Sequence, residues 1–362
     1  MSLSQRTGPK RGERELFSPA LQNPCLAPDP RLMQTFNRFF VFCVALSVLL
    51  TGLAPAESAG SQPSSSPVKP PMDRSAAKSM FDAWKAPVPP RHLIGNIYYV
   101  GAIGVSSYLI TTPAGHILID TGFEETVPLI QHSVEQLGFK LSDIRIMLSS
   151  HAHIDHTGGH ALMKKLTRAQ VMASAEDARI LASGGADDFI PFPKDMIIYP
   201  PVAVDHIVND GAEVTLGGVT LTAHLTPGHT RGATTWTMDV AADGQSYHVV
   251  FFSSASISPG TSLLLAPPYP ELVQDFENTF ARLKQLPCDI FFAPHGGQFA
   301  MAEKFAQLER NPQPNPFIDP AGWRSLIDNA EKAFRGQLAA ERTQMGQNPS
   351  RESESTPPRP TP

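Results

Sequence analysis

Cysteine is scarce in this chain of 362 residues, which has only three, Cys25, Cys43 and Cys288. The first two fall in N-terminal segments that we expect to be removed, so a single thiol would remain in the mature protein. An internal disulfide is therefore excluded there. A large hydrophobic core can stabilise an exported domain without one.

A strong charge of either sign is also lacking. Lys and Arg together number 29 and Asp and Glu together 34, which gives a formal net charge of −5. A protein that binds nucleic acid usually presents a basic surface, so we expect no nucleic-acid partner. The mild excess of acidic residues indicates no other partner.

The N-terminal region lacks a hydrophobic run long enough to span a membrane. Its apolar run, Phe39–Leu53, is about 15 residues long, whereas a transmembrane helix needs about 20. Arg38 precedes this run, and Ala54, Pro55 and Ala56 follow it. A basic residue, a short apolar stretch and small residues, in this order, are typical of a secretory signal peptide.

We place the signal peptide within residues 33–58, in an N-terminal extension that covers residues 1–58. This predicts a periplasmic or secreted protein with no stable membrane insertion after cleavage. The sequence leaves three alternatives open, which are cleavage beside Ala59, a translation start at Met33 in place of Met1, and an uncleaved anchor.

Composition divides the rest of the chain into a linker at residues 59–79, a folded domain at 80–338 and a disordered tail at 339–362. Within the domain, strand-like runs alternate with helical ones. We predict strands at 97–100, 107–111, 116–120, 144–148, 171–173, 219–224, 234–238, 247–252 and 289–292. We predict helices at 127–137, 158–166, 176–181, 272–286 and from 320. Two β-rich halves with helices outside predict an α/β fold, a four-layer αββα sandwich with ligand loops at one edge between the sheets.

His151, His153, Asp155 and His156 place four potential metal ligands within six residues, directly after the predicted strand 144–148. In an extended chain, residues i and i+2 point the same way, so His151 and His153 can bind one ion. The chain must turn at Asp155 and His156, and the small residues that follow allow that turn.

His229 and His295 each follow a predicted strand and lie next to glycine, which lets the backbone approach a metal closely. Five imidazoles and one carboxylate suffice for two zinc ions with three protein ligands each, and this leaves positions for water and substrate. These ligands favour zinc over Mg²⁺ or Ca²⁺, whereas ligand type alone does not exclude iron. The set indicates a metal-dependent hydrolase.

Several segments of the domain resemble the metallo-β-lactamase superfamily and, more narrowly, subclass B3 of the class B β-lactamases. The resemblance covers most of residues 80–338. The segments that carry it are residues 95–101, 115–122, 151–159, 184–188, 199–201, 226–236 and 286–289.

The resemblance implies two zinc sites with three ligands each, which are His151, His153 and His229 for the first and Asp155, His156 and His295 for the second. It also implies a buried supporting role for Asp120. Cysteine-using subclasses place a thiolate on the strand 247–254, and glyoxalase II, lactonases and RNase Z-like nucleases usually place a bridging Asp there. This chain has neither residue there. These absences favour a β-lactamase.

Substrate contacts are predicted on two segments. By the resemblance, a serine near residue 256 contacts the substrate carboxylate, and Ser254, Ser256 and Ser258 compete for this role. Phe189, Ile190, Phe192 and Ile197 are predicted to form an apolar wall over the substrate. The alternative is that the serines are solvated loop residues and that the apolar residues pack their own loop against the domain.

The resemblance implies a monomeric zinc β-lactamase that acts on penicillins, cephalosporins and carbapenems. Zinc lowers the pKa of bound water from about 15.7 to about 7, which makes hydroxide available at neutral pH. Asp155 would position this hydroxide for attack on the β-lactam carbonyl. Three alternatives stay open: a zinc hydrolase of the same fold that acts on a lactone or thioester, an iron-binding oxidoreductase, and a non-catalytic binding module.

Overall fold

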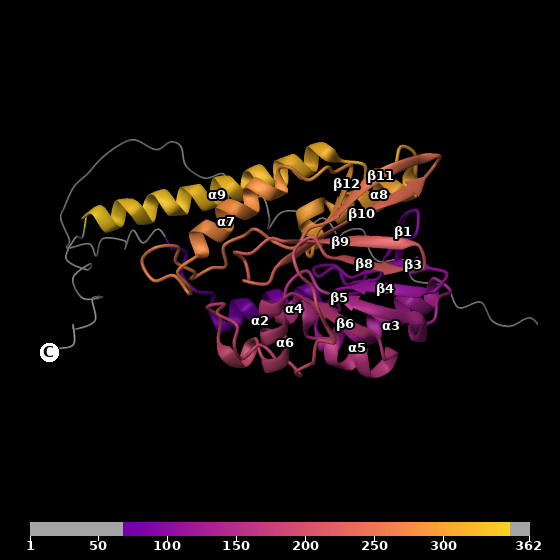
Figure 1. Cartoon of the computed structure of the whole chain (residues 1–362), viewed down its shortest axis with the longest axis horizontal. Helices are drawn as coiled ribbons and strands as arrows, with labels where there is room; N and C mark the ends of the chain where they lie inside the picture. The colour runs from indigo at the N-terminus through magenta and orange to yellow at the C-terminus, as the bar shows by residue number, and fades with distance from the viewer. Residues whose placement is uncertain (1–67, 348–362) are drawn as a thin grey trace, which may run out of the picture. The chain divides into compact units, whose positions relative to one another are not determined.

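Two β-sheets pack face to face between two groups of helices in the computed structural model, which describes residues 68–347 (Figure 1). One sheet has seven strands in the order β1-β2-β3-β4-β5-β6-β7, and the other has five in the order β12-β11-β10-β9-β8. Both sheets are mixed, because β4 to β7 pair in parallel in the first and β11 pairs in parallel with β12 in the second. The predicted four-layer αββα sandwich is confirmed.

The strands are β1 (Arg91–Ile94), β2 (Ile97–Tyr99), β3 (Tyr108–Thr112), β4 (Gly115–Ile119), β5 (Ile144–Leu148), β6 (Gln170–Ala173), β7 (His206–Ile207), β8 (Glu213–Leu216), β9 (Val219–Leu225), β10 (Thr234–Ala242), β11 (Gln245–Phe251) and β12 (Ile290–Phe292). The α-helices are α2 (Arg74–Trp84), α3 (Val127–Gln136), α4 (Ile154–Thr157), α5 (His160–Thr167), α6 (Ala175–Ser183), α7 (Leu272–Leu283), α8 (Met301–Arg310) and α9 (Pro320–Gln347). Short 3-10 turns are η1 (Glu124–Thr126), η2 (Leu141–Asp143), η3 (Lys194–Met196) and η4 (Gly296–Phe299).

Side chains along the central strands point alternately to the two faces of the sheet. This divides the hydrophobic core into an inner part between the two sheets and an outer part under the helices. On β3, the ring of Tyr108 faces the other sheet, with its centroid 5.4 Å from that of Phe251, and Leu109 points to the outer cluster that contains Val127 and Ile130 of α3. Successive strand residues point to opposite faces, so a strand covered on both sides must be apolar throughout. This is why residues 108–110 of β3, 117–119 of β4 and 146–148 of β5 are continuous hydrophobic runs.

Helices α7 and α9 cover the five-stranded sheet (Figure 1). The ring of Phe334 on α9 lies 5.3 Å from Phe276 and 5.6 Å from Phe280 of α7. Helix α9 continues to Gln347, so the expected disorder from residue 339 is wrong for residues 339–347. The apolar spacing fades after Leu338, and the helix continues because the polar Glu341 is buried and hydrogen-bonded there.

Helix α2 occupies residues that composition placed in a linker. Asp73 caps it by accepting hydrogen bonds from the N–H groups of Ser75 (2.9 Å) and Ala76 (3.0 Å), and Ala77 and Phe81 are buried. The linker prediction is therefore wrong for residues 74–79. The predicted signal peptide at 33–58 lies outside the described residues. Within residues 68–347, no helix is both long enough and apolar enough to cross a membrane.

Candidate metal centre

The six predicted ligands gather at one edge of the sandwich, where they form two adjacent groups. His151 and His153 follow β5, His229 lies between β9 and β10, and His295 follows β12. In the first group (His151, His153 and His229) and the second (Asp155, His156 and His295), the candidate ligand atoms lie within 4.8 Å of one another. The rings of His151 and His156 join the groups, because their centroids are 4.3 Å apart.

The chain changes from extended to helical after His153. This change places His151 and His153 in the first group and Asp155 and His156 in the second. His153 is extended (φ −76°, ψ 154°) and precedes α4, whose first turn carries Asp155 and His156. Gly159 lies where a Cβ would be 2.6 Å from Cγ2 of Val127, so only glycine fits this approach. The predicted helix at 158–166 begins at His160 instead, because Gly158 ends α4 and Gly159 caps α5.

In the first group, neighbouring atoms determine which ring nitrogen remains free. The Nδ1 of His229 donates to the carbonyl of Ser256 at 2.8 Å, and the Nδ1 of His151 lies 3.1 Å from the Ser150 hydroxyl. The Nε2 of His153 lies 3.4 Å from the Asp188 carboxylate. These contacts leave Nε2 of His151, Nε2 of His229 and Nδ1 of His153 for a metal.

The second group is built around the carboxylate of Asp155. It lies 3.2 Å from Nε2 of His156 and 3.6 Å from Nε2 of His295, and the Nδ1 of His295 donates to the carbonyl of Gly104 at 2.9 Å. Asp120 stands behind His156, 3.7 Å from its Nδ1. Asp120 accepts two hydrogen bonds of 2.7 Å from the N–H and hydroxyl of Ser150, so it supports the loop that carries the ligands.

The protonation states of His151, His229, His295 and Asp155 suit these four side chains to metal binding. Burial and the neighbouring imidazoles lower the pKa of His151 well below its usual value and that of His229 to about 3, and burial and His156 lower that of His295 to about 4. These rings are therefore neutral at pH 7 and keep a lone pair. Burial would raise the pKa of Asp155, but His156 and His295 beside it outweigh burial and lower it, so the carboxylate stays ionised.

Several buried ring nitrogens of the candidate ligands have no hydrogen-bond partner among the residues that the structure describes, which is expected if a metal ion binds them. Nε2 of His151 and both ring nitrogens of His156 are buried without a hydrogen-bond partner in the described part of the chain. Each unpaired buried polar group costs about 1–3 kcal/mol, so buried ring nitrogens without a partner inside two groups of candidate ligand atoms indicate that a cation pairs with them. Neutral imidazoles with one carboxylate match the ligands that zinc prefers.

Two aspartates support the first group, and sequence reasoning assigned a role to neither. Asp188 is buried beside His153; burial would raise its pKa, but His153 outweighs burial and lowers it. Asp177 on α6 accepts from the Thr230 hydroxyl at 3.2 Å, and burial raises its pKa to about 7. Asp188 lies in the segment 184–188, which resembles the family, so the sequence did point to it. No sequence pattern pointed to Asp177.

A cavity of about 200 Å³ opens over both groups. Its apolar walls come from α2, from Met72 two residues before it, from the segment 190–197 and from the segment 256–259. The residues are Met72, Met80, Phe81, Trp84, Ile190, Phe192, Ile197, Ile257 and Pro259. The ring of Trp84 lies 4.6 Å from that of His295. Sequence reasoning missed α2, although an N-capping Asp73 followed by Ala77, Phe81 and Trp84 at helical spacing was a usable signal.

The predicted substrate-contact residues separate into two sets. Ile190, Ser256 and Ser258 line the cavity. Ser254 is buried and lies 3.2 Å from the hydroxyl of Ser256, behind the wall. Phe189 packs on Tyr269, with ring centroids 5.5 Å apart. Ser254 and Phe189 therefore do not line this cavity, and Phe189 packs its own loop against Tyr269.

Arg231, Trp236 and Cys288 make contacts within the fold. The guanidinium of Arg231 lies 4.8 Å from the ring of Tyr269, and Trp236 is a core residue whose Nε1 donates to the carbonyl of Ser149 at 3.0 Å. Cys288 is a free, half-buried thiol whose pKa burial raises to about 12.

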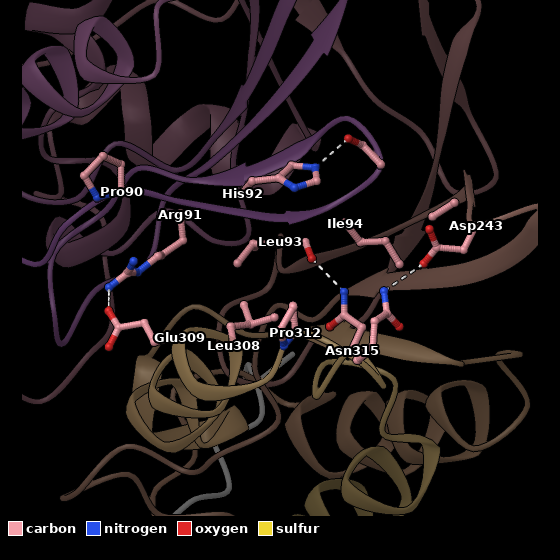
Figure 2. Close-up of a pocket in the computed structure, with 13 residues that line it drawn as sticks. Pro90, Arg91, His92, Leu93, Ile94, Asp243, Leu308, Glu309, Pro312 and Asn315 are labelled. Atoms are coloured by element: carbon pink, nitrogen blue, oxygen red, sulfur yellow. Dashed lines mark hydrogen bonds and ion pairs between the residues drawn. The ribbon is translucent and has the colours of Figure 1, made fainter.

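A larger hollow of about 600 Å³ lies between β1, the β10–β11 turn and the segment after α8 (Figure 2). Arg91 pairs there with Glu309, and Asn315 donates to the carbonyl of Leu93 at 2.8 Å. None of the six candidate ligands lines this hollow. Its size therefore gives no reason to place the chemistry there.

Two sheets between helices, with two groups of three metal-binding side chains at one edge, define a class of metal-dependent hydrolases. The family model of the metallo-beta-lactamase superfamily matches residues 100–295, and the chain belongs to this superfamily.

Solved structures place the chain near subclass B3. It is 41% identical to the native FEZ-1 metallo-beta-lactamase from Legionella gormanii, with a TM-score of 0.70, over 71% of this chain and 98% of that one. It is 38% identical to BJP-1, a subclass B3 metallo-beta-lactamase of Bradyrhizobium japonicum, with a TM-score of 0.68, over 73% of this chain and 98% of that one.

The matching curated proteins are more distant. A hydroxyacylglutathione hydrolase from Rhodopseudomonas palustris is 26% identical over 182 residues, which are 50% of this chain and 58% of that protein. The chain spans about half the length of the curated relatives it matches, between 40% and 58%.

Proposed function

We propose that this chain is a zinc-dependent β-lactamase that opens the β-lactam amide bond of penicillins, cephalosporins and carbapenems. The observation that carries the proposal is the composition of the second group, in which His156 completes the ligands. Residues 247–254, which run from β11 into the following loop, contain no Cys, Asp or Glu. By the family resemblance, other subclasses place a metal-binding thiolate there, and glyoxalase II and lactonases a bridging Asp.

The similarity to FEZ-1 and BJP-1 supports the same proposal, because it extends over almost the whole length of both β-lactamases. Two zinc ions, one held by His151, His153 and His229 and one by Asp155, His156 and His295, would lower the pKa of a bound water to about 7 and polarise the substrate carbonyl.

The chain's own residues then orient the reactants. The ionised Asp155 accepts a hydrogen bond from the attacking water and aims its oxygen at the carbonyl carbon. The water oxygen bonds to that carbon, the ring C–N bond breaks, and the ring nitrogen takes up a proton, so that one water is added. The hydroxyls of Ser256 and Ser258 can donate to the substrate carboxylate, and the apolar walls exclude bulk water.

A zinc hydrolase that acts on a lactone or thioester is the second candidate, and the match to hydroxyacylglutathione hydrolase favours it. Glutathione carries two carboxylates at neutral pH, and a site for it is expected to offer basic side chains. No Lys or Arg is among the described residues that line the cavity. The thioester is therefore the weaker alternative.

The test is hydrolysis of a chromogenic cephalosporin by the purified chain, with and without a zinc chelator, together with elemental analysis. We expect turnover that the chelator abolishes and zinc restores, with about two zinc ions per chain. Bound zinc with hydrolysis of S-lactoylglutathione or a lactone, and none of the cephalosporin, would support the second candidate. Bound iron would instead favour an oxidoreductase.

We also propose that the protein is periplasmic or secreted, without stable membrane insertion, and that it acts as a monomer. The location is supported only by the signal-like sequence at 33–58. N-terminal sequencing of the protein recovered from a cell's periplasmic and extracellular fractions, followed by its mass in solution, tests these points.

A further inference from the structure

Glu341, near the end of α9, is a fully buried carboxylate that holds a distant loop. It accepts hydrogen bonds from the backbone N–H groups of Leu263 (3.0 Å), Leu264 (2.8 Å) and Leu265 (3.2 Å), and from the Ser262 hydroxyl (2.7 Å). The loop runs from the end of β11 at Phe251 to the start of α7 at Leu272 and contains no strand or helix. Backbone bonds also anchor it at Phe252, which donates to the carbonyl of Phe292, and at Gly260, which donates to the carbonyl of Lys69, both at 2.8 Å.

Gln337, one helical turn before Glu341, completes the attachment. Its Nε2 donates to the carbonyl of Thr261 at 2.8 Å and to the carboxylate of Glu341 at 2.8 Å. The amide thus binds the loop and also orients the carboxylate. We call residues 261–265 the clamped segment.

The clamped segment continues directly into the cavity wall. The N–H of Thr261 donates to the carbonyl of Ser258 at 3.0 Å, and residues 256–259 line the cavity. The carbonyl of Ser256 in turn accepts from Nδ1 of His229, a candidate ligand of the first group. Hydrogen bonds therefore lead from α9 through the loop to both the substrate wall and the metal group.

We infer that Glu341 is a positioning residue, which sets the substrate-facing wall 256–259 by fixing the clamped segment; as to the substrate, this rests on the proposed function. A carboxylate that accepts several N–H bonds forms charge-assisted hydrogen bonds, which are stronger than neutral ones. A site needs its contact groups held to within about 0.5 Å, and a loop without regular structure needs an anchor of this kind.

The experiment compares the full-length E341Q variant with a matched control, F334L. Gln has the size of Glu, but its NH2 group turns a donor toward the N–H groups of the loop. Phe334 is buried on the same helix and packs on Phe276 and Phe280, and its ring offers no hydrogen bond to the loop. Both variants therefore lose stability, and only E341Q loses the clamp.

For E341Q we expect backbone hydrogen exchange at residues 263–265 to be faster by about tenfold. We expect KM for the chromogenic cephalosporin to rise by about fivefold with kcat within about twofold, because the wall and not the reacting groups has moved. F334L should lower Tm without either change. Equal exchange and KM in E341Q and the wild type, or the same KM rise in F334L, would overturn the inference.

The inference can still be tested if E341Q does not fold or if the wild type hydrolyses no β-lactam. If E341Q does not fold, Q337A removes the bond to Thr261, and its exchange at 261–265 must be faster than in F334L for the clamp to stand. If the wild type hydrolyses no β-lactam, the proposed function fails by itself. The exchange comparison between E341Q and F334L still decides the clamp.

Discussion

The floor and the roof of the candidate active site are built in different ways. The floor, which consists of the six candidate ligands, comes from chain that leaves β5, β9 and β12. The roof, which consists of the cavity residues of α2, 190–197 and 256–259, comes from a helix outside the sheets and from two loops. The chemistry thus rests on rigid strand ends and the substrate contacts on adaptable segments.

The two parts meet at few points. Asp188 lines the cavity and lies 3.4 Å from His153, and the carbonyl of Ser256 accepts from His229. If the division is correct, changes to the floor should abolish metal binding and turnover, and changes to the roof should alter substrate affinity alone.

Loss of a floor ligand should have the largest effect. His151→Ala removes one of three ligands of the first group, so zinc content should fall and kcat/KM should drop by at least about a thousandfold. Elemental analysis and cephalosporin hydrolysis measure both. A variant that keeps its zinc and full turnover would show that His151 is not part of the site.

A pH experiment tests the buried acid behind the floor. Burial raises the pKa of Asp177 to about 7 in the folded protein. Between its usual pKa near 4 and about 7, the folded state therefore binds the proton that the unfolded state releases, and stability falls as pH rises through this window. Asp177→Asn should remove this loss, which is at most about 1.4 kcal/mol per pH unit.

The measurement is the unfolding free energy of chelator-treated protein from pH 5 to pH 8. The neighbouring Glu176→Gln, on the half-exposed side of α6, is the control. Parallel curves for Asp177→Asn and the wild type would mean that Asp177 titrates normally.

Asp188→Asn tests the point where roof and floor meet. It keeps the shape of the side chain and removes the charge beside Nε2 of His153, so zinc affinity should fall by about 10- to 100-fold. Chelator competition measures the affinity. The neighbouring Asp187 is exposed, and Asp187→Asn is the matched control. Equal zinc affinities in the two variants would show that Asp188 does not support zinc binding by His153.

Two phenylalanines of one loop give the smallest predicted effect. Phe192 lines the cavity, whereas Phe189 packs on Tyr269. Phe192→Ala should raise KM by about three- to tenfold with little change in kcat, and Phe189→Ala should leave KM within about twofold. Steady-state kinetics with one cephalosporin measure both KM values. A KM rise in Phe189→Ala alone would mean that Phe189, and not Phe192, faces the substrate.

Much of the floor could be predicted from the sequence, because its patterns span only a few neighbouring residues. The spacing of His151, His153, Asp155 and His156 after an apolar strand predicts a pair of metal groups, and strand ends bring His229 and His295 to the same edge. An Asp-Gly pair is typical of a hairpin turn, and Asp243 and Gly244 between β10 and β11 both have positive φ, 50° and 75°. The binding of zinc itself stays a prediction.

The amino-acid sequence by itself determined the sandwich and the candidate ligands, because alternation and ligand spacing act within a few neighbouring residues. Only the tertiary structure decided that α2 covers the site, that Phe189 turns away while Ile190 faces the cavity, and that Glu341 holds the loop 261–265. Such contacts join residues far apart in the chain, for example Leu263 and Glu341, which are separated by 78 in sequence number. Their partners are set by the packing of the whole domain, which no local pattern encodes.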